Sequence, residues 1–205
     1  MKLVIASGNR GKLAEFRDLL GDDGIEFVAQ GELGVRDVEE TGLSFVENAV
    51  LKARNAARAT GLPALADDSG LCVDALDGAP GLYSARYAGG HGDDAANIAA
   101  LLAALAGVPA PRRSACFHAV IVVLRHAHDP RPLIAEGSWR GRILEAPRGT
   151  GGFGYDPVFL DPGSGLSAAE LEPARKHRIS HRGRALAALR PLLSGAFDQG
   201  EPPCS

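Results

Sequence analysis

One segment, residues 115–124, constrains the fold more than any other part of the chain. It is a nearly continuous run of apolar and β-branched residues, ACFHAVIVVL. Such a run is suited to a strand in the interior of a sheet. Near the start of the chain, the apolar run Lys2–Ala6 gives way to a glycine-containing loop and then to apolar residues near helical spacing, at Leu13, Phe16, Leu19 and Leu20. The N-terminal pattern therefore predicts strand, loop and helix.

The rest of the chain continues to alternate between the two kinds of element. Further strands are expected at residues 25–29, 62–66 and 133–144. Further helices are expected from the capping box Ser44–Glu47 to Gly61, over residues 95–106, and from Ser180 to Leu193. This alternation predicts an α/β protein with a mixed sheet and a central cleft. We expect one domain over residues 1–197 and a frayed tail over 198–205.

Composition narrows the class of protein. The 205 residues are 45% apolar and 23% charged, as in ordinary soluble proteins, and contain no apolar run of about 18 residues. The apolar N-terminal run meets polar residues too soon for a signal peptide, so we expect a cytoplasmic protein without a membrane partner. The net charge of −3 argues against a nucleic-acid groove. Three widely spaced cysteines predict reduced thiols rather than a disulfide framework or a zinc site.

The stretch Gly151–Pro157 interleaves three glycines with Phe153, Tyr155 and Asp156. Glycine lets the backbone approach a planar ring closely, and an aromatic face stacks on a nucleobase at roughly 1–3 kcal/mol per base. The stretch is therefore a candidate nucleotide site. Its alternative interpretation is a glycine-rich turn whose two aromatic rings cap the core.

The loop between the first strand and the first helix is a candidate phosphate site. It consists of Ser7, Gly8, Asn9, Arg10, Gly11 and Lys12. Free amides at the positive end of a helix attract phosphate, and Lys12 adds a full charge. The spacing is shorter than that of a Walker loop, and Leu13 stands where that loop needs a hydroxyl. A plain strand-to-helix turn is the alternative.

Carboxylates gather in two further segments. Asp67, Asp68 and Ser69 follow the strand expected at 62–66, and Glu39 and Glu40 precede the second helix. Hard oxygen ligands of this kind suit Mg²⁺ bound jointly with substrate phosphates. Successive strand residues point to opposite faces, so Asp67 and Asp68 are expected to have different roles. The alternative is an acidic turn with a solvated surface pair.

A basic segment lies at the expected start of the last helix. Three cations and two imidazoles occur in Lys176–Arg182. A nucleoside polyphosphate would meet charge, hydrogen-bond donors and a helix N-terminus together there. A solvated basic face is the alternative.

Taken together, six ordered segments resemble one family, the non-canonical purine NTP pyrophosphatases, also called inosine triphosphate pyrophosphatase-like or Ham1-like proteins. The segments span residues 7 to 183 and are SGNRGK at 7–12, EETGLSFVENA at 39–49, ADDSGL at 66–71, GAPGLYSARY at 78–87, GTGGFGYDP at 149–157 and ISHRG at 179–183. The resemblance implies a bilobal α/β fold, in which a long central mixed β-sheet flanked by helices holds a nucleotide cleft between the lobes. It also implies a homodimer and an activity that depends on Mg²⁺.

The resemblance further implies hydrolysis of ITP, dITP and XTP to the monophosphate and pyrophosphate, which keeps deaminated purines out of DNA and RNA. Asp68 would accept a proton and bind metal together with Glu39 or Glu40. The loop Ser7–Lys12 would hold the triphosphate, and Lys52 is expected to reach the phosphates as well. The remaining substrate contacts would come from Ser69, Phe153, Gly154, Tyr155, Asp156, Lys176, His181 and Arg182.

Two other functions stay open at this point. One is a purine nucleotide sensor that binds without turnover, although carboxylates concentrated near polyphosphate favour a metal-dependent enzyme. The other is a pyrophosphatase with a different base specificity, for example for modified pyrimidine nucleotides. In either case the expected ligand is a small nucleoside triphosphate.

Overall fold

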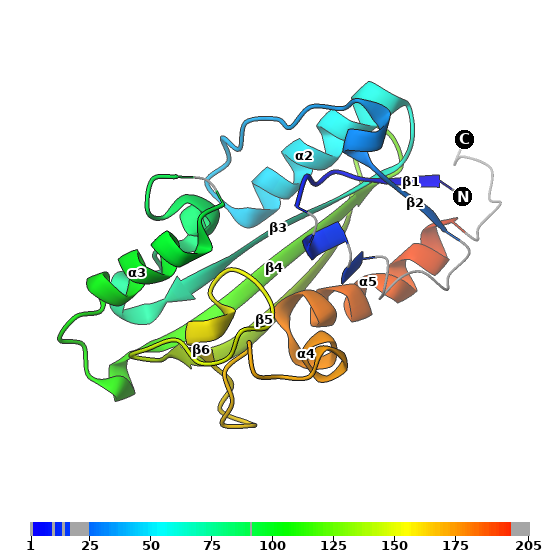
Figure 1. Cartoon of the computed structure of the whole chain (residues 1–205). Helices are drawn as coiled ribbons and strands as arrows, with labels where there is room; N and C mark the ends of the chain where they lie inside the picture. The colour runs from blue at the N-terminus through cyan, green and yellow to red at the C-terminus, as the bar shows by residue number, and fades with distance from the viewer. Residues whose placement is uncertain (1, 10, 14, 17–24, 91, 198–205) are drawn as a thin grey trace.

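The computed structural model of the chain describes residues 2–9, 11–13, 15–16, 25–90 and 92–197. Its centre is a six-stranded sheet in the order β2-β1-β3-β4-β5-β6 (Figure 1). β1 runs parallel to β2 and β3, and the remaining neighbours are antiparallel. The mixed sheet is therefore confirmed. Its strands are β1 (Lys2–Ile5), β2 (Glu26–Ala29), β3 (Ala64–Val73), β4 (Ser114–Leu124), β5 (Leu133–Ile143) and β6 (Phe159–Leu160).

Helices cover both faces of this sheet. In Figure 1, α2 lies on one side of the long strands and α5 on the other. The α-helices are α2 (Phe45–Thr60), α3 (Asp94–Ala104), α4 (Pro173–Ile179) and α5 (His181–Phe197). Short 3₁₀ helices are η1 (Gln30–Leu33), η2 (Asp74–Leu76), η3 (Gly81–Arg86), η4 (Ala110–Arg112) and η5 (Asp156–Val158). Within the described part of the chain, none of the helices has the length and apolarity that a membrane crossing needs.

The first two helices of the chain follow local signals in the sequence. The predicted first helix is present at residues 11–13 and 15–16, and Leu19 and Leu20 lie outside the described residues. At the start of α2 the Ser44 hydroxyl accepts a hydrogen bond from the Glu47 amide, and the Glu47 carboxylate in turn accepts one from the Ser44 hydroxyl. The predicted capping box is thus confirmed.

The continuous apolar run of β4 is explained by burial on both faces. Ala119, Ile121 and Val123 pack in one cluster with residues of α5, whereas Val120, Val122 and Leu124 pack in another with alanines of α2. Successive strand residues point to opposite faces, so a strand covered on both sides is apolar throughout. The helix on each face is therefore held by alternate residues of the same strand.

A third cluster fills the other end of the long strands. Leu101 of α3 and Leu105, which directly follows the helix, pack there with Trp139 of β5 and Phe159 of β6. The sheet thus carries one lobe with β1, β2, α2 and α5, and a second with α3, β6 and the glycine-rich segment. This arrangement confirms the bilobal α/β expectation.

The prediction of a strand over 62–66 with acidic residues at its end is wrong in its boundaries. β3 runs from Ala64 to Val73, so Asp67, Asp68 and Ser69 lie within the strand. β1 pairs with β3 only at Ala64 and Leu65, which leaves the following edge of β3 free of β1. Ionic partners on both faces of the strand, described below, compensate for the charge of the two carboxylates.

The position of α5 depends on one glycine of β5. A Cβ atom at Gly137 would lie 2.0 Å from the His181 carbonyl oxygen and 2.5 Å from the Ala185 nitrogen. Only glycine permits this close approach of helix and strand. The first residues of α5, His181 and Arg182, are consequently held against the sheet at the centre of the molecule.

Candidate active site

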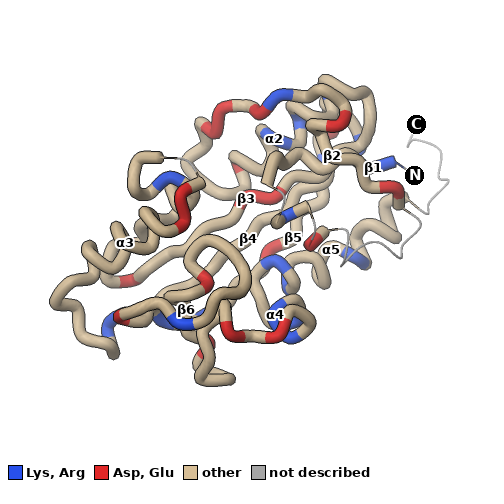
Figure 2. Tube along the Cα trace, viewed as in Figure 1, with Lys and Arg blue, Asp and Glu red and all other residues tan. Residues whose placement is uncertain are grey.

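A cleft of about 830 Å³ lies between the two lobes, beside the edge of β3 that continues past its pairing with β1. Pockets of roughly 300–1,000 Å³ are typical of small-molecule sites. Figure 2 shows acidic positions on β3 and basic positions on α4 and at the start of α5 around this same region. Of the described residues expected at the site, all but Gly11 line the cleft: Ser7, Gly8, Asn9, Lys12, Glu39, Glu40, Lys52, Asp68, Ser69, Phe153, Gly154, Tyr155, Asp156, Lys176, His181 and Arg182. Arg10 lies outside the described residues.

One side of the cleft, which we call the α2 wall, is built around Lys52 of α2. The Lys52 Nζ lies 2.8 Å from Glu40 Oε1 and 2.7 Å from Asp68 Oδ1. Arg86 of η3 approaches the other oxygen of Glu40 at 3.5 Å. Glu39 also lines the cleft but is exposed. The α2 wall therefore consists of two carboxylates bridged by one ammonium group, with Glu40 rather than Glu39 next to Asp68.

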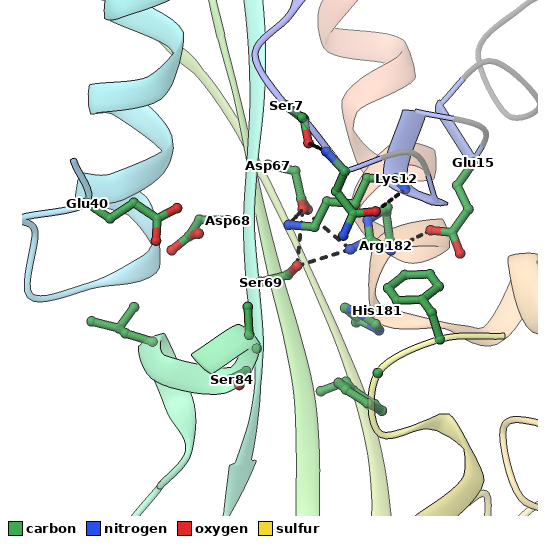
Figure 3. Close-up of a pocket in the computed structure, with 18 of the residues that line it drawn as sticks. Ser7, Lys12, Glu15, Glu40, Asp67, Asp68, Ser69, Ser84, His181 and Arg182 are labelled. Atoms are coloured by element: carbon green, nitrogen blue, oxygen red, sulfur yellow. Dashed lines mark hydrogen bonds and ion pairs between the residues drawn. The ribbon is translucent and has the colours of Figure 1, made fainter. Parts of the chain in front are cut away.

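The other side, the α5 wall, is centred on Asp67. Lys12 Nζ lies 2.6 Å from Asp67 Oδ2, and Arg182 Nη2 lies 3.4 Å from the same oxygen. Arg182 also donates to the Ser69 hydroxyl at 3.0 Å and forms an ion pair with Glu15. Figure 3 shows Lys12, Arg182 and Glu15 on one side of β3, with Glu40 and Asp68 on the other. Adjacent residues of one strand thus serve two separate ionic clusters.

The two neighbouring aspartates differ in protonation chemistry. Burial would raise the pKa of Asp67, but the charges of Arg182 and Lys12 outweigh it and hold that pKa far below its ordinary value. At Asp68, burial is the largest effect and raises the pKa despite the opposing charge of Lys52. Asp67 is therefore a fixed anion, and Asp68 is the better proton acceptor. The expectation of different roles agrees with this contrast.

The loop from Ser7 to Lys12 ends in a helix cap. The Asn9 side chain accepts a hydrogen bond from the Lys12 amide at 3.1 Å, and the Asn9 carbonyl accepts one from the Leu13 amide. A helix that begins in this way turns its positive end toward the preceding loop. A Cβ at Gly11 would lie 3.3 Å from the ring of Phe153, so this loop lies against the glycine-rich segment.

The two aromatic rings of the glycine-rich segment have different surroundings. Phe153 is partly exposed in the cleft, with Lys176 Nζ 5.2 Å and the Arg182 guanidinium carbon 5.8 Å from its ring centre. Tyr155 is buried in the core of the second lobe, and its hydroxyl donates to the Ser84 carbonyl at 2.9 Å. The core-capping alternative thus describes Tyr155, whereas Phe153 offers its ring to the cleft.

A buried ion pair lies beneath this segment. Asp156 accepts hydrogen bonds from Lys176 Nζ and from the Phe153 amide. Burial raises the pKa of Asp156, against the opposing effect of Lys176. Gly152 has φ of +75°, and a Cβ there would lie 2.0 Å from an Asp156 carboxylate oxygen. The glycine is required here both by its conformation and by the carboxylate beside it.

His181 is a neutral ring at the base of the cleft. Burial, reinforced by the charge of Arg182, lowers its pKa well below the ordinary value. Its ring stacks on Phe117 with centroids 4.8 Å apart. Among the described residues, three buried side-chain atoms lack a hydrogen-bond partner: Asp67 Oδ1, His181 Nδ1 and Arg182 Nε. All three belong to residues that line the cleft, and unpaired buried polar atoms cost about 1–3 kcal/mol each.

The residues missed by the sequence analysis include four polar or charged ones that line the cleft: Glu15, Ser84, Arg86 and Asp94. Glu15 follows Lys12 by three positions. Residues three apart lie on the same face of a helix, so this spacing could have indicated that Glu15 lies beside Lys12. Ser84 and Arg86 belong to the segment GAPGLYSARY, to which no role was given. Asp94 accepts a hydrogen bond from the Gly154 amide at 2.7 Å and so joins α3 to the glycine-rich segment. No sequence pattern pointed to this last contact.

The oxygen donors of the α2 wall fit a hard divalent cation. Asp68 and Glu40 already converge on one cationic group, the Lys52 ammonium. In the described part of the chain, no group of three or more His, Cys, Asp or Glu side chains converges as a complete metal site. Mg²⁺ is commonly bound by only one or two carboxylates, with water and substrate phosphates as its other ligands. The donor set therefore suits a metal shared with a polyphosphate.

Comparison with known proteins identifies relatives that match almost the whole chain. The sequence model of the Ham1 family matches residues 3–192. A protein of Xanthomonas campestris pv. campestris named dITP/XTP pyrophosphatase is 68% identical over 191 residues, which are 93% of this chain and 96% of the relative. A protein of the same name from Vibrio parahaemolyticus is 56% identical over 198 residues, 97% of this chain and 99% of the relative.

The fold is also similar to solved structures. A HAM1 protein from Coxiella burnetii superposes with a TM-score of 0.89 at 52% identity, covering 96% of this chain and 100% of that one. A Ham1 protein from Staphylococcus aureus superposes with a TM-score of 0.84 at 41% identity, covering 95% and 99%.

Proposed function

The chain belongs to the Ham1 family, and we propose that it is a dITP/XTP pyrophosphatase that hydrolyses ITP, dITP and XTP to the monophosphate and pyrophosphate. Relatives that carry this name are up to 68% identical and match almost the whole chain. The activity would remove deaminated purine nucleotides before they enter DNA or RNA.

One observation carries the proposal: lysines and carboxylates gather at one end of the cleft, and an aromatic ring with cations beside it lies at the other. The α2 wall combines a lysine with two carboxylates, and Lys12 lies across β3 from it. At the other end the ring of Phe153 lies among cations and buried polar groups. A nucleoside triphosphate has the same division, because a polyanion is attached to a flat ring with polar edges.

Asp68 is the residue best suited to activate water. Its pKa is raised by burial, which makes its carboxylate a stronger base than an exposed aspartate. We propose that Asp68 accepts a proton from a water molecule as this water attacks the α-phosphorus, with pyrophosphate as the leaving group. Lys12 and Lys52 offset the charge of the phosphates, as cations do in other phosphoryl-transfer sites.

Mg²⁺ is the proposed cofactor. Asp68 and Glu40 would hold it together with the phosphates, and it would supply a Lewis acid that neutralises charge on them. Lys52 contacts both of these carboxylates. Its ammonium balances their charge in the free protein and lies close enough to turn toward a bound polyphosphate.

Base selection is assigned to the other end of the cleft. Lys176 and Arg182 are cationic donors that lie 5.2 Å and 5.8 Å from the ring centre of Phe153, and we propose that they contact a base stacked on this ring. A 6-oxo purine accepts hydrogen bonds from such donors, whereas the amino group of adenine leaves them unpaired. A site that hydrogen-bonds a substrate group can reject analogues that lack it by about 10⁴-fold.

We further propose that the protein acts as a homodimer in the cytoplasm, where nucleoside triphosphates are made and used. Two large side chains that are exposed in the single chain are consistent with the dimer. Leu43, just before α2, is 90% exposed, and Tyr83 of η3 is 61% exposed. Apolar side chains of this size are commonly covered in oligomers.

The test is a substrate panel with both products measured. Pyrophosphate and orthophosphate release from ITP, dITP, XTP, GTP and ATP should be followed with magnesium and then with EDTA. We expect magnesium-dependent pyrophosphate from the first three substrates and little from GTP or ATP. Orthophosphate as the sole product would show that the bond assignment is wrong, and tight ITP binding without turnover would favour a sensor.

A variant pair separates catalysis from binding. Asp68→Asn should lower kcat by about 10²–10⁴-fold, the usual contribution of a general base, while ITP still binds. Asp74→Asn is the matched control, because Asp74 is exposed on η2 outside the cleft. Full activity in the Asp68 variant would refute the base assignment.

A further inference from the structure

Two cysteines outside the cleft lie opposite each other on neighbouring strands. Cys72 of β3 and Cys116 of β4 are direct partners in the antiparallel register. Residues that are directly opposed in this way point to the same face of the sheet, with Cβ atoms about 4.5–5.5 Å apart. Neither cysteine belongs to the site described above. The register alone therefore places the two thiols side by side.

Backbone hydrogen bonds define the kind of pair. The amides of Leu71 and Val73 donate to the Ser84 hydroxyl at 2.9 Å and to the Ala79 carbonyl at 3.2 Å, on the side of β3 away from β4. Since alternate strand residues turn their amides to opposite edges, the backbone groups of Cys72 face β4. Cys72 and Cys116 are thus a hydrogen-bonded pair, in which Cα atoms lie about 5.5 Å apart. Disulfides occur at Cα separations of about 4.4–6.8 Å and need Cβ atoms about 3.5–4.5 Å apart, so this pair meets the Cα range and closes with a small approach of the two strands.

Neither cysteine is fully buried. Both cysteines are free, and both are partly exposed. Burial, and then the neighbouring Cys116, raises the pKa of Cys72, as expected if the two sulfur atoms are close. On its other edge, Cys72 forms a single β-bridge with Pro80, just before η3. The pair is therefore a partly exposed dithiol between two paired strands of the sheet.

We propose that Cys72 and Cys116 form a redox-active dithiol that closes to a disulfide between β3 and β4, with oxidised glutathione or a similar small disulfide as the oxidant. One cysteine thiolate attacks a sulfur of the oxidant, which forms a mixed disulfide and releases one glutathione thiolate. The second cysteine thiolate then attacks the protein sulfur of that mixed disulfide and releases the other. The protein loses two protons and two electrons, and the oxidant becomes two molecules of glutathione.

The bond would join strands that are already neighbours. β3 carries Asp67 and Asp68 toward the cleft, and Cys72 lies two residues beyond Gly70, which lines it. Closing the pair therefore ties the strand that bears both catalytic-site aspartates to the centre of the sheet. This inference does not depend on the proposed substrate.

The test uses the full chain with Cys204→Ser, which removes the third cysteine of the sequence. The protein is equilibrated with defined ratios of oxidised to reduced glutathione, quenched with acid, and analysed by intact mass and by thiol count. We expect both thiols to be lost together, a mass lower by two hydrogen atoms, and a single Cys72–Cys116 cross-link after digestion without reductant. The product should be the same at low and high protein concentration.

Two further variants serve as controls. Adding Cys72→Ser or Cys116→Ser should stop the reaction at the mixed disulfide, so that one glutathione adduct per chain accumulates. The proposal would be overturned if the protein with both cysteines accumulated adducts at each, formed disulfides only between chains, or kept both thiols at ratios that oxidise glutaredoxin-type dithiols.

Discussion

Replacing Asp67 with asparagine tests the assignment of this residue as the fixed anion of the α5 wall. The side chain is 1% exposed, and its oxygen lies 2.6 Å from Lys12 Nζ and 3.4 Å from Arg182 Nη2. Asparagine keeps the shape but removes the charge. Two buried cations then face each other across a neutral group.

The expected cost follows from this burial. Removing one partner of a buried ion pair typically destabilises a protein by about 3–5 kcal/mol, because the remaining charge is left uncompensated. For a chain of this size, each kcal/mol corresponds to about 2–4 °C in Tm, so a loss of roughly 6–20 °C is expected. The folded-state pKa of Asp67 lies below its ordinary value of 3.8, so its contribution is complete above pH 5. The difference between wild type and variant should shrink as pH falls below 4.

The free energy of unfolding should be measured with urea in EDTA, with and without inorganic tripolyphosphate. The first condition gives the stability lost in Asp67→Asn, and the second tests whether the missing negative charge causes the loss. Because a polyphosphate supplies the missing negative charge near Lys12, it should stabilise Asp67→Asn more than it stabilises the wild type. Asp129→Asn is the control: Asp129 is also 1% exposed and paired with an arginine, Arg125, but lies outside the cleft. Equal stabilisation of all three proteins by tripolyphosphate, or an unchanged stability of Asp67→Asn, would refute the reasoning.

Two more predictions concern the α2 wall and the glycine-rich segment. Lys52→Gln should destabilise the protein at pH 7 in EDTA, because two carboxylates lose the shared ammonium. Because the pKa of Lys52 is raised, this contribution is complete below pH 10.5 and is lost as the ammonium deprotonates at higher pH. At acid pH the difference between wild type and variant in urea unfolding should also shrink, as Asp68 and Glu40 become protonated. Loss at pH 3 as large as at pH 7 would contradict this. Gly152→Ala should raise KM for ITP, because the added Cβ would lie 2.0 Å from an Asp156 carboxylate oxygen. Gly165→Ala is the control, since Gly165 has a similar φ of +72° but open space around it. It should cost only about 1–2 kcal/mol of stability and leave KM unchanged. Similar KM values in the two variants would count against a role for the buried ion pair.

Local patterns in the sequence predicted most of the fold. The apolar run at 115–124, the capping box at Ser44 and the glycine at 61 each act through neighbouring residues, and each element was found where expected. The short helix α4 was missed because its seven residues, Pro173–Ile179, contain too few turns to show an apolar stripe.

The misplaced end of β3 has a different cause. Two aspartates, a serine and a glycine in succession are typical of a turn, yet here they continue a strand of ten residues. Their charge is compensated by Lys12 on one face and Lys52 on the other, and these lysines are distant in sequence. Local sequence propensity depends only on neighbouring residues, so it cannot predict charge compensation by lysines that are distant in the chain. For the same reason the site residues were predicted as separate segments, while the pairing of each carboxylate with its own lysine required the structure.

The alternation of Asp67 and Asp68 on one strand has a consequence for how such an enzyme can change. β3 separates two ionic clusters, with Asp67 paired to Lys12 on one face and Asp68 paired to Lys52 on the other (Figure 3). Under the proposed function, the base would be held on the first of these faces, and the proton acceptor would lie on the other. Substitutions around Phe153 and Arg182 can therefore alter which nucleotide is accepted without disturbing the proton acceptor. New substrate preferences can evolve in this scaffold while the reaction itself stays the same.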